Sequence, residues 1–196
     1  MVLQYGMGRV EAGWHVCEHI PPGYVRVYYV HGGSVRYTDE AGERMLLPEH
    51  LYWFPSNKPY QMVQREEDPL VCTHLHLDVS PDVVDTVAAL PVMEDPFLLP
   101  YLAALEQAVS AKNTGLVDGM AECLVEYGMQ RQVVVPLTVG LSEATAYIAA
   151  HLEEPLEVSS LARMAGYTRQ HFSRLFKQTM GLTPYQYIIG LRMKRA

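Results

Sequence analysis

The sequence contains little cysteine and no long hydrophobic run. Only three cysteines occur in 196 residues, Cys17, Cys72 and Cys123, and their wide spacing excludes a disulfide framework. Such low cysteine use is typical of the reducing cytoplasm. No run of about 18 uncharged apolar residues is present, which excludes a membrane span. The N-terminus has no basic region followed by an apolar one, so we expect no secretion signal.

Basic residues are also scarce, with 15 Lys and Arg against 22 Asp and Glu, a net charge of −7. Their distribution is uneven. Residues 1–140 carry 8 basic and 18 acidic side chains (8 − 18 = −10), whereas residues 141–196 carry 7 and 4 (7 − 4 = +3). From Leu156 onward the only acidic residue is Glu157. An acidic body with a basic C-terminal segment is typical of a sensor joined to a nucleic-acid-binding unit, with chance clustering as the alternative.

Short β-rich runs separated by turn residues extend from Gly13 to about Asp78. A strand is predicted at residues 24–30, with a tight turn and a returning strand at 34–38. Further strands are predicted at 44–47, 51–54, 60–64 and 70–78. About seven or eight short strands at this spacing predict a sandwich or a small barrel.

Helical periodicity follows the strands. Residues 97–112 and 116–131 show it, and the short connection between them predicts an antiparallel pair. These helices either cover the β-rich part or form a partner surface. The valine-rich residues 134–140 are interpreted as an interdomain linker, although the valines could equally form an edge strand. A further helix is predicted to begin at Ser142.

The C-terminal residues have the spacing of a helix-turn-helix. A helix is predicted at 158–165, and Gly166 supplies the positive φ angle that the tight turn needs. Thr168 is a good N-cap for a second helix that runs to about Met180. The second helix presents a polar face that fits the major groove of DNA. The alternative is an ordinary helical hairpin with a solvated basic face.

Residues 156–196 resemble the first helix-turn-helix of the AraC family of bacterial transcriptional regulators. The matching residues are 161–162, 166–168, 172–177, 181–184, Tyr187, Arg192 and Ala196. The β-rich half is more loosely similar to the cupin-type sensor of that family. Two departures are present. Glu157 stands where a Ser or Thr cap often begins the motif, and the sequence ends inside the helix that joins two such motifs, so we expect a truncated form with one motif.

This resemblance implies an α+β chain in four parts. These are a cupin-like ligand-sensing barrel or jelly roll at 1–80, a helical dimerisation segment at 81–133, a linker at 134–140 and the truncated DNA-binding segment at 141–196. The implied function is a ligand-responsive, sequence-specific DNA-binding regulator that acts as a homodimer on promoter DNA in the cytoplasm. We expect no cofactor, no membrane association and no enzymatic activity.

The resemblance also assigns roles on the second motif helix. Base edges are expected to be contacted by Gln170, Ser173 and Arg174, because arginine can donate two hydrogen bonds to guanine and glutamine can bind adenine. Phosphate contacts, which position the helix without specifying sequence, are expected from Arg169, Lys177 and Tyr185.

Aromatic residues are dense in the β-rich half, where nine occur within about fifty residues. Rings with a polar edge suit sugars, and the resemblance also implies a sugar or another small metabolite as the effector. We expect the pocket to be lined by Trp14, Tyr28, Tyr37, Tyr60, His74 and His76. The alternative is that these rings only fill a small barrel.

A second pattern favours a different function. Two imidazoles and a thiol share one face of a strand in each of two triplets, His15–Cys17–His19 and Cys72–His74–His76. Two such side chains can reach one metal ion, so the alternative is a cupin metal-binding protein or metal-dependent enzyme that uses His74 and His76. No nucleophile elbow, phosphate-binding glycine loop or paired carboxylates are legible, so we expect no other catalytic site.

Overall fold

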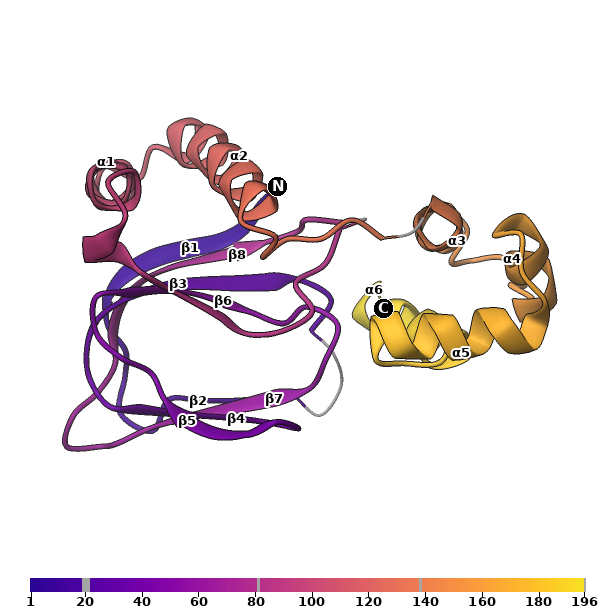
Figure 1. The fold of residues 1–196 in the computed structure, drawn as a ribbon, viewed down its shortest axis with the longest axis horizontal. Helices are drawn as coiled ribbons and strands as arrows, with labels where there is room; N and C mark the ends of the chain where they lie inside the picture. The colour runs from indigo at the N-terminus through magenta and orange to yellow at the C-terminus, as the bar shows by residue number, and fades with distance from the viewer. Residues whose placement is uncertain (19–21, 81, 138, 196) are drawn as a thin grey trace.

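Two antiparallel sheets lie face to face in the N-terminal part of the computed structural model, which describes residues 1–18, 22–80, 82–137 and 139–195 (Figure 1). The five-stranded sheet has the order β1 (Val2–Arg9), β8 (Val71–Leu77), β3 (Val25–Gly32), β6 (His50–Phe54) and β9 (Ala88–Pro91). The four-stranded sheet has the order β2 (His15–Glu18), β7 (Tyr60–Gln64), β4 (Val35–Asp39) and β5 (Gly42–Met45). The predicted α+β class, with a β-sandwich before the helices, is confirmed.

Neither edge strand of the larger sheet was predicted from the sequence pattern. Strand β1 pairs with β8 over most of its length, but it contains two glycines, which β-strands disfavour. Strand β9 has only four residues and pairs with β6 opposite Tyr52 and Trp53. It lies beyond residue 80, so the larger sheet continues into the segment that the sequence interpretation assigned to helices.

The alternation of residues along the strands separates two hydrophobic clusters. On β3, Val25 and Val27 belong to the cluster beneath the helices, whereas Tyr28 and Val30 belong to the cluster between the two sheets. Arg26 shares the parity of Tyr28 and therefore also faces the space between the sheets. The structure thus decides which strand faces point inward, which the sequence pattern leaves open.

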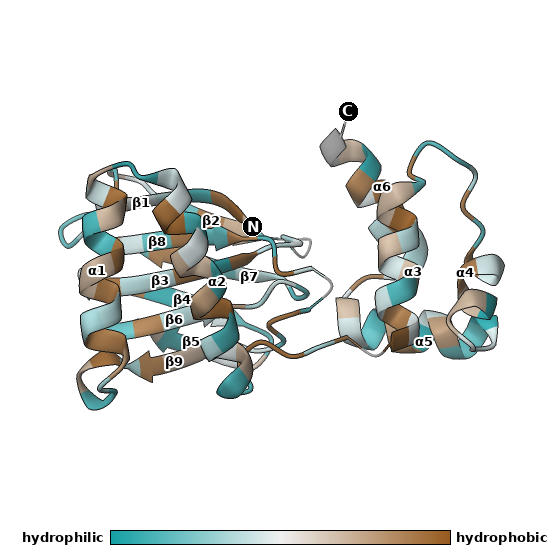
Figure 2. Ribbon diagram, turned by 90° about the horizontal axis from the view of Figure 1, so that it is seen from above, coloured by the Kyte–Doolittle hydropathy of each residue, from teal (hydrophilic) through white to brown (hydrophobic). Residues whose placement is uncertain are grey.

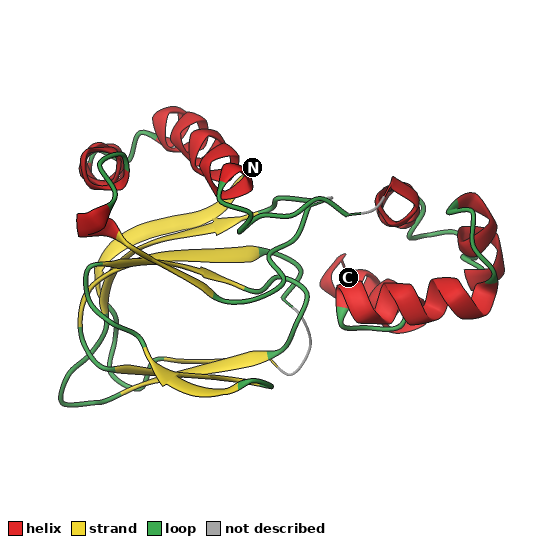
Figure 3. Cartoon of the chain, in the orientation of Figure 1, coloured by secondary structure: helices red, strands yellow, loops and turns green. Residues whose placement is uncertain are grey.

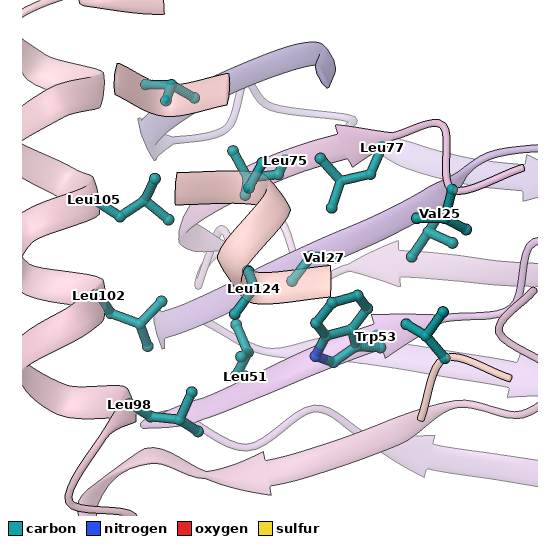
Figure 4. Packing of buried hydrophobic residues seen from close by; sticks show 14 of the residues in the cluster. Val25, Val27, Leu51, Trp53, Leu75, Leu77, Leu98, Leu102, Leu105 and Leu124 are labelled. Atoms are coloured by element: carbon teal, nitrogen blue, oxygen red, sulfur yellow. The ribbon is translucent and has the colours of Figure 1, made fainter. Parts of the chain in front are cut away.

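Helices α1 (Leu98–Ser110) and α2 (Thr114–Gln130) cover the outer face of the five-stranded sheet, after the short 3₁₀ helix η1 (Val92–Glu94) (Figure 2). Three leucines of α1 point toward this sheet, at the spacing of one helix face, as Figure 4 shows for Leu98, Leu102 and Leu105. Trp53 is fully buried in the same cluster. The predicted helix pair is therefore a cover of the sandwich.

Four shorter helices follow, α3 (Val139–Ala150), α4 (Val158–Met164), α5 (Arg169–Met180) and α6 (Pro184–Arg195) (Figure 3). Their buried side chains form a separate cluster that includes Leu141, Ile148 and Phe172. The predicted helix start at Ser142 is wrong, because Ser142 lies inside α3, where its carbonyl accepts a hydrogen bond from Thr145 Oγ1. None of the helices in the described part of the chain is long and apolar enough to cross a membrane.

An antiparallel bridge lies in the connection between the two parts. Val135 donates its N–H to the carbonyl of Val83 at 2.9 Å and accepts one from Val83 N at 3.0 Å. The valine-rich segment, predicted as a linker or an edge strand, thus pairs with the sandwich at Val135. Thr138, within the predicted linker, lies outside the described residues.

Candidate functional site

The turn between α4 and α5 has the geometry that the sequence predicts. Gly166 has a φ of 76°, in the left-handed region that glycine adopts without strain. Thr168 is the N-cap of α5, and its Oγ1 accepts a hydrogen bond from His171 N at 3.3 Å. Ala162 is buried where the helices approach, and its carbonyl accepts a bond from Tyr167 N at 2.9 Å. These contacts hold α5 at a defined angle to α4.

Helix α5 has one buried face and one polar face. Phe172 and Phe176 are fully buried, with ring centroids 5.4 Å apart, and Phe176 meets Tyr187 of α6 edge-on at 5.3 Å. Five of the predicted DNA-contact residues lie on this helix. Ser173 is half-buried, and the other four are exposed, namely Arg169, Gln170, Arg174 and Lys177. Residues 170, 173, 174 and 177 follow the i, i+3, i+4, i+7 spacing of a single face.

Two further contacts shape this surface. Arg174 Nη2 lies 3.5 Å from His171 Nδ1, and the His171 ring stacks on Tyr167 with centroids 5.0 Å apart. Tyr185, in the first turn of α6, is 67% exposed. All six predicted DNA-contact residues are thus at least partly accessible.

Helix α6 is fixed by contacts that the sequence interpretation did not include. Thr183 and Gln186 form a capping box, in which Thr183 Oγ1 accepts from Gln186 N at 3.3 Å and Gln186 Oε1 accepts from Thr183 N at 3.0 Å. Arg192 donates to the carbonyls of Leu152 and Glu154, at 2.8 and 2.7 Å. The arginine matched to the family pattern therefore ties α6 to the turn that follows α3. The T-x-x-Q spacing was the available signal for the cap.

Comparison with known proteins agrees with this geometry. Residues 148–188 match the family model of bacterial regulatory helix-turn-helix proteins, AraC family. The match runs from the end of α3 through α5 into α6, across the packed helices just described. Residues 148–188 therefore form an AraC-type helix-turn-helix segment. The AraC-type segment accounts for the predicted turn, cap and polar face together.

Curated proteins similar to this chain include regulators with limited identity. It is 25% identical over 188 residues to the uncharacterized HTH-type transcriptional regulator YobQ of Bacillus subtilis, an alignment covering 88% of this chain and 73% of YobQ. It is 34% identical over 59 residues to the transposon Tn10 TetD protein of Escherichia coli, covering 30% of this chain and 43% of TetD. Among solved structures, apo ToxT K231A from Vibrio cholerae matches with 9% identity and a TM-score of 0.50, covering 95% and 97% of the two chains. That likeness concerns the fold alone.

The space between the two sheets holds a polar cluster centred on Arg26. Its guanidinium donates to Glu18 Oε1 at 2.5 Å, to the Tyr24 hydroxyl at 2.6 Å and to the Tyr60 hydroxyl at 2.7 Å. Burial alone would lower the pKa of Arg26, but Tyr60 and Glu18 outweigh it and raise the pKa, so the guanidinium stays charged. The sequence interpretation missed Glu18, Tyr24 and Arg26 as site residues. An arginine within an otherwise apolar strand was the signal.

Aromatic rings surround this cluster. Tyr28 lies 6.4 Å from Trp14, 6.0 Å from His74 and 6.2 Å from His76, measured between ring centroids. The Tyr37 and Tyr60 rings stack at 5.5 Å. The structure therefore brings together all six residues that were predicted to line the pocket, Trp14, Tyr28, Tyr37, Tyr60, His74 and His76.

Both histidines of this group are neutral at physiological pH. Burial lowers the pKa of His74, and burial, with Arg26 and His74 nearby, lowers the pKa of His76 to about 4. The ring of His74 fits against β1 because Gly6 has no side chain. A Cβ at Gly6 would lie 2.8 Å from His74 Cε1.

The described members of the two histidine–cysteine triplets do not converge. Cys72, His74 and His76 face the space between the sheets, whereas His15 and Cys17 of β2 are exposed. Burial raises the pKa of the Cys72 thiol to about 12, which disfavours the thiolate that a metal requires. Within the described ranges, no three His, Cys, Asp or Glu side chains are grouped to hold a metal ion. His19 lies outside those ranges.

Proposed function

We propose that this chain is an AraC-family regulator that binds promoter DNA sequence-specifically through α5 and responds to a small metabolite bound between its two sheets. The observation that carries the proposal is the polar face of α5, which presents Arg169, Gln170, Arg174 and Lys177 to solvent opposite two buried phenylalanines. A helix of this kind, set by a tight turn against a preceding helix, fits the major groove. The organisation in four parts, with a DNA-binding segment at 141–196, belongs to the same proposal.

Residues at the centre of the polar face of α5 select bases, and residues around them position the helix on the phosphates. Gln170, Ser173 and Arg174 contact base edges, and each good bidentate pair contributes about 1–3 kcal/mol of discrimination. Phosphates are contacted by Arg169, Lys177 and Tyr185. The test is a selection from random duplex DNA with the chain. An enriched motif that disappears with a Gln170→Ala, Arg174→Ala double variant supports the assignment, and an unchanged motif contradicts it.

The metabolite is a carbohydrate in this proposal. The apolar faces of a sugar stack on aromatic rings such as Trp14 and Tyr28, and its hydroxyls need both donors and acceptors. The charged pair of Arg26 and Glu18 supplies both within the same interior, 2.5 Å apart. A small polar molecule with several hydroxyls satisfies this combination better than a purely apolar one.

A thermal-shift screen with mono- and oligosaccharides tests the effector class. A sugar with micromolar affinity at millimolar concentration stabilises the folded state by about 4 kcal/mol, which is a large shift. Repeating the screen with EDTA and with added zinc separates the alternative, a metal site at His74 and His76, whose ring centroids lie 5.5 Å apart. Stabilisation by a sugar that is indifferent to EDTA supports the sensor, whereas destabilisation by EDTA without a sugar response supports the metal.

Assembly as a cytoplasmic homodimer completes the proposal. Helices α1 and α2 cover the sandwich, yet some of their apolar side chains remain exposed, including Phe97 at the start of α1, Leu99 and Leu116. Such side chains are suited to contact a second copy. Sedimentation at several concentrations measures whether the chain self-associates.

A further inference from the structure

A cavity lies between the β-sandwich and the helix-turn-helix segment, and it meets the Arg26 cluster at Tyr24. Its volume is about 230 Å³, slightly below the range of about 300–1,000 Å³ typical of small-molecule sites. Val79 and Val83 line it from the sandwich side. Apolar side chains from the other part also line it, namely Leu137, Met180, Leu182 and Leu191. Met180 is the last residue of α5, so this cavity borders the end of the proposed recognition helix.

One residue of the cavity wall carries an unsatisfied acceptor. Asn57 lines the cavity and is only 1% exposed. Its Nδ2 donates to Asp85 Oδ1 at 2.9 Å and to the carbonyl of Thr179, so two acceptors fix the orientation of the amide. Its Oδ1 has no hydrogen-bond partner within the described residues. A buried acceptor without a donor destabilises the folded state, and a ligand that donates a hydrogen bond removes this cost.

The charged groups of the wall are acidic. Asp78 and Asp82 line the cavity, and none of its lining residues in the described ranges is a lysine, arginine or histidine. Burial raises the pKa of Asp82, because its carboxylate is partly desolvated. A desolvated carboxylate without a cationic neighbour favours a ligand that brings a positive charge.

We propose that this cavity binds a small, mainly apolar molecule that carries an amine. The apolar walls would take the hydrocarbon part, and the ammonium group would donate hydrogen bonds to Asn57 Oδ1 and to the carboxylate of Asp82. Because Met180 and the Thr179 carbonyl belong to α5, a bound amine fixes the end of this helix against the sandwich. The site meets the proposed sugar site at Tyr24, so its test follows Met180 and Met62 separately and uses no DNA.

The test compares three probes with the same six-carbon chain and different head groups, hexylamine, 1-hexanol and hexanoate. Binding is followed at pH 7 by NMR of the full chain labelled with ¹³C in its methionine methyl groups. Met180 reports on the cavity, and Met62, buried between the two sheets, reports on the sandwich interior. We expect hexylamine to shift the Met180 signal saturably, at least about fivefold more tightly than hexanol, with hexanoate weakest.

Two pairs of variants locate the binding. Asp82→Asn should reduce the hexylamine affinity to that of hexanol, whereas Glu143→Gln, which removes an exposed carboxylate from α3, should leave it unchanged. Gly190→Leu should abolish binding of all three probes, because Gly190 lines the cavity and a Cβ there meets no atom within 4 Å. Gly119→Leu makes the same change on α2, where there is also open space, and should not affect binding.

Three outcomes would overturn the proposal. These are hexanoate binding as tightly as hexylamine, a response at Met62 in place of Met180, and an unchanged affinity in Gly190→Leu. An absence of any hexylamine response also overturns it, since an ordered water would then satisfy Asn57.

Discussion

Arg174 and Lys177 lie about one turn apart on the exposed face of α5, yet we expect their loss to have different effects. Arg174→Ala should relax the base preference at one position of the selected site, at a cost of about 1–3 kcal/mol for the preferred sequence. Lys177→Ala should weaken all sequences alike and reduce the salt slope of log K by about 0.9. Fluorescence anisotropy with the selected site and its single-base variants, at several salt concentrations, measures both. Equal losses on every sequence in both variants would refute the division of roles.

His76 gives a pH dependence of stability whose sign follows from its pKa. The folded value of about 4 lies below the usual 6.5, so the unfolded chain takes up a proton that the folded chain does not. The contribution of neutral His76 to the free energy of unfolding is complete above about pH 6.5 and is lost as the pH falls toward 4. Allowing for the partial exposure of the ring, the loss between pH 7.5 and 5 is about 1 kcal/mol.

Urea unfolding of the wild type and of His76→Gln at the two pH values isolates this contribution. Between pH 7.5 and 5, the free energy of unfolding of the variant should fall by about 1 kcal/mol less than that of the wild type. His74, whose pKa is also lowered by burial, acts in the same direction in both proteins. Equal losses would mean that His76 is not the desolvated group that the structure shows.

Arg26 shows what residue patterns in a sequence can and cannot predict. Alternation along β3 predicts that Arg26 and Tyr28 share a face, but it cannot decide whether this face meets solvent or the opposite sheet. That choice depends on which face α1 and α2 cover, a contact between segments about seventy residues apart. The pocket aromatics could be predicted from composition, whereas Glu18 and Arg26 become site residues only through the pairing of β2 with β7.

At the scale of the elements, local signals predicted the parts with strong periodicity. The helix-turn-helix was predictable because its cap, its positive-φ glycine and its buried phenylalanines are all local. Strand β9 was not, since its four residues become a strand only by pairing with β6. Helix α3 begins three residues before Ser142, where the apolar Val139 and Leu141 already belong to the helix.

The packing of α2 on the sheet depends on a glycine. A Cβ at Gly128 would lie 2.9 Å from Val134 Cγ2 and 3.1 Å from Trp53 Cη2, so Gly128→Ala should shift the helix and destabilise the fold by about 1–3 kcal/mol. Gly119→Ala on the same helix meets open space and should stabilise it by up to about 1 kcal/mol. Thermal unfolding of both variants compares them directly. A Gly128→Ala variant as stable as Gly119→Ala would contradict the close approach of α2 to Trp53.

At the scale of the whole molecule, two parts with separate hydrophobic clusters are joined by few contacts. The cluster around Phe172 consists of C-terminal residues apart from Val83 and the linker residues Val135 and Leu137. Beyond the Val83–Val135 bridge, Asn57 donates a hydrogen bond to the Thr179 carbonyl across the interface. So small a connection favours unfolding of the two parts as separate cooperative units.

The positions of the tryptophans make this independence measurable. Trp14 and Trp53, the two tryptophans of the sequence, both lie in the sandwich, so their fluorescence follows that part, whereas circular dichroism at 222 nm also follows the C-terminal helices. Phe172→Ala removes a fully buried ring and should destabilise the C-terminal part by about 3–5 kcal/mol. The dichroism should then show an early transition while the fluorescence midpoint stays unchanged. Leu102→Ala, in the core beneath α1, should move the fluorescence midpoint instead. If Phe172→Ala shifted both signals equally, the two parts would be one cooperative unit, and a ligand bound to the sandwich could act on α5 without any rearrangement of the cavity.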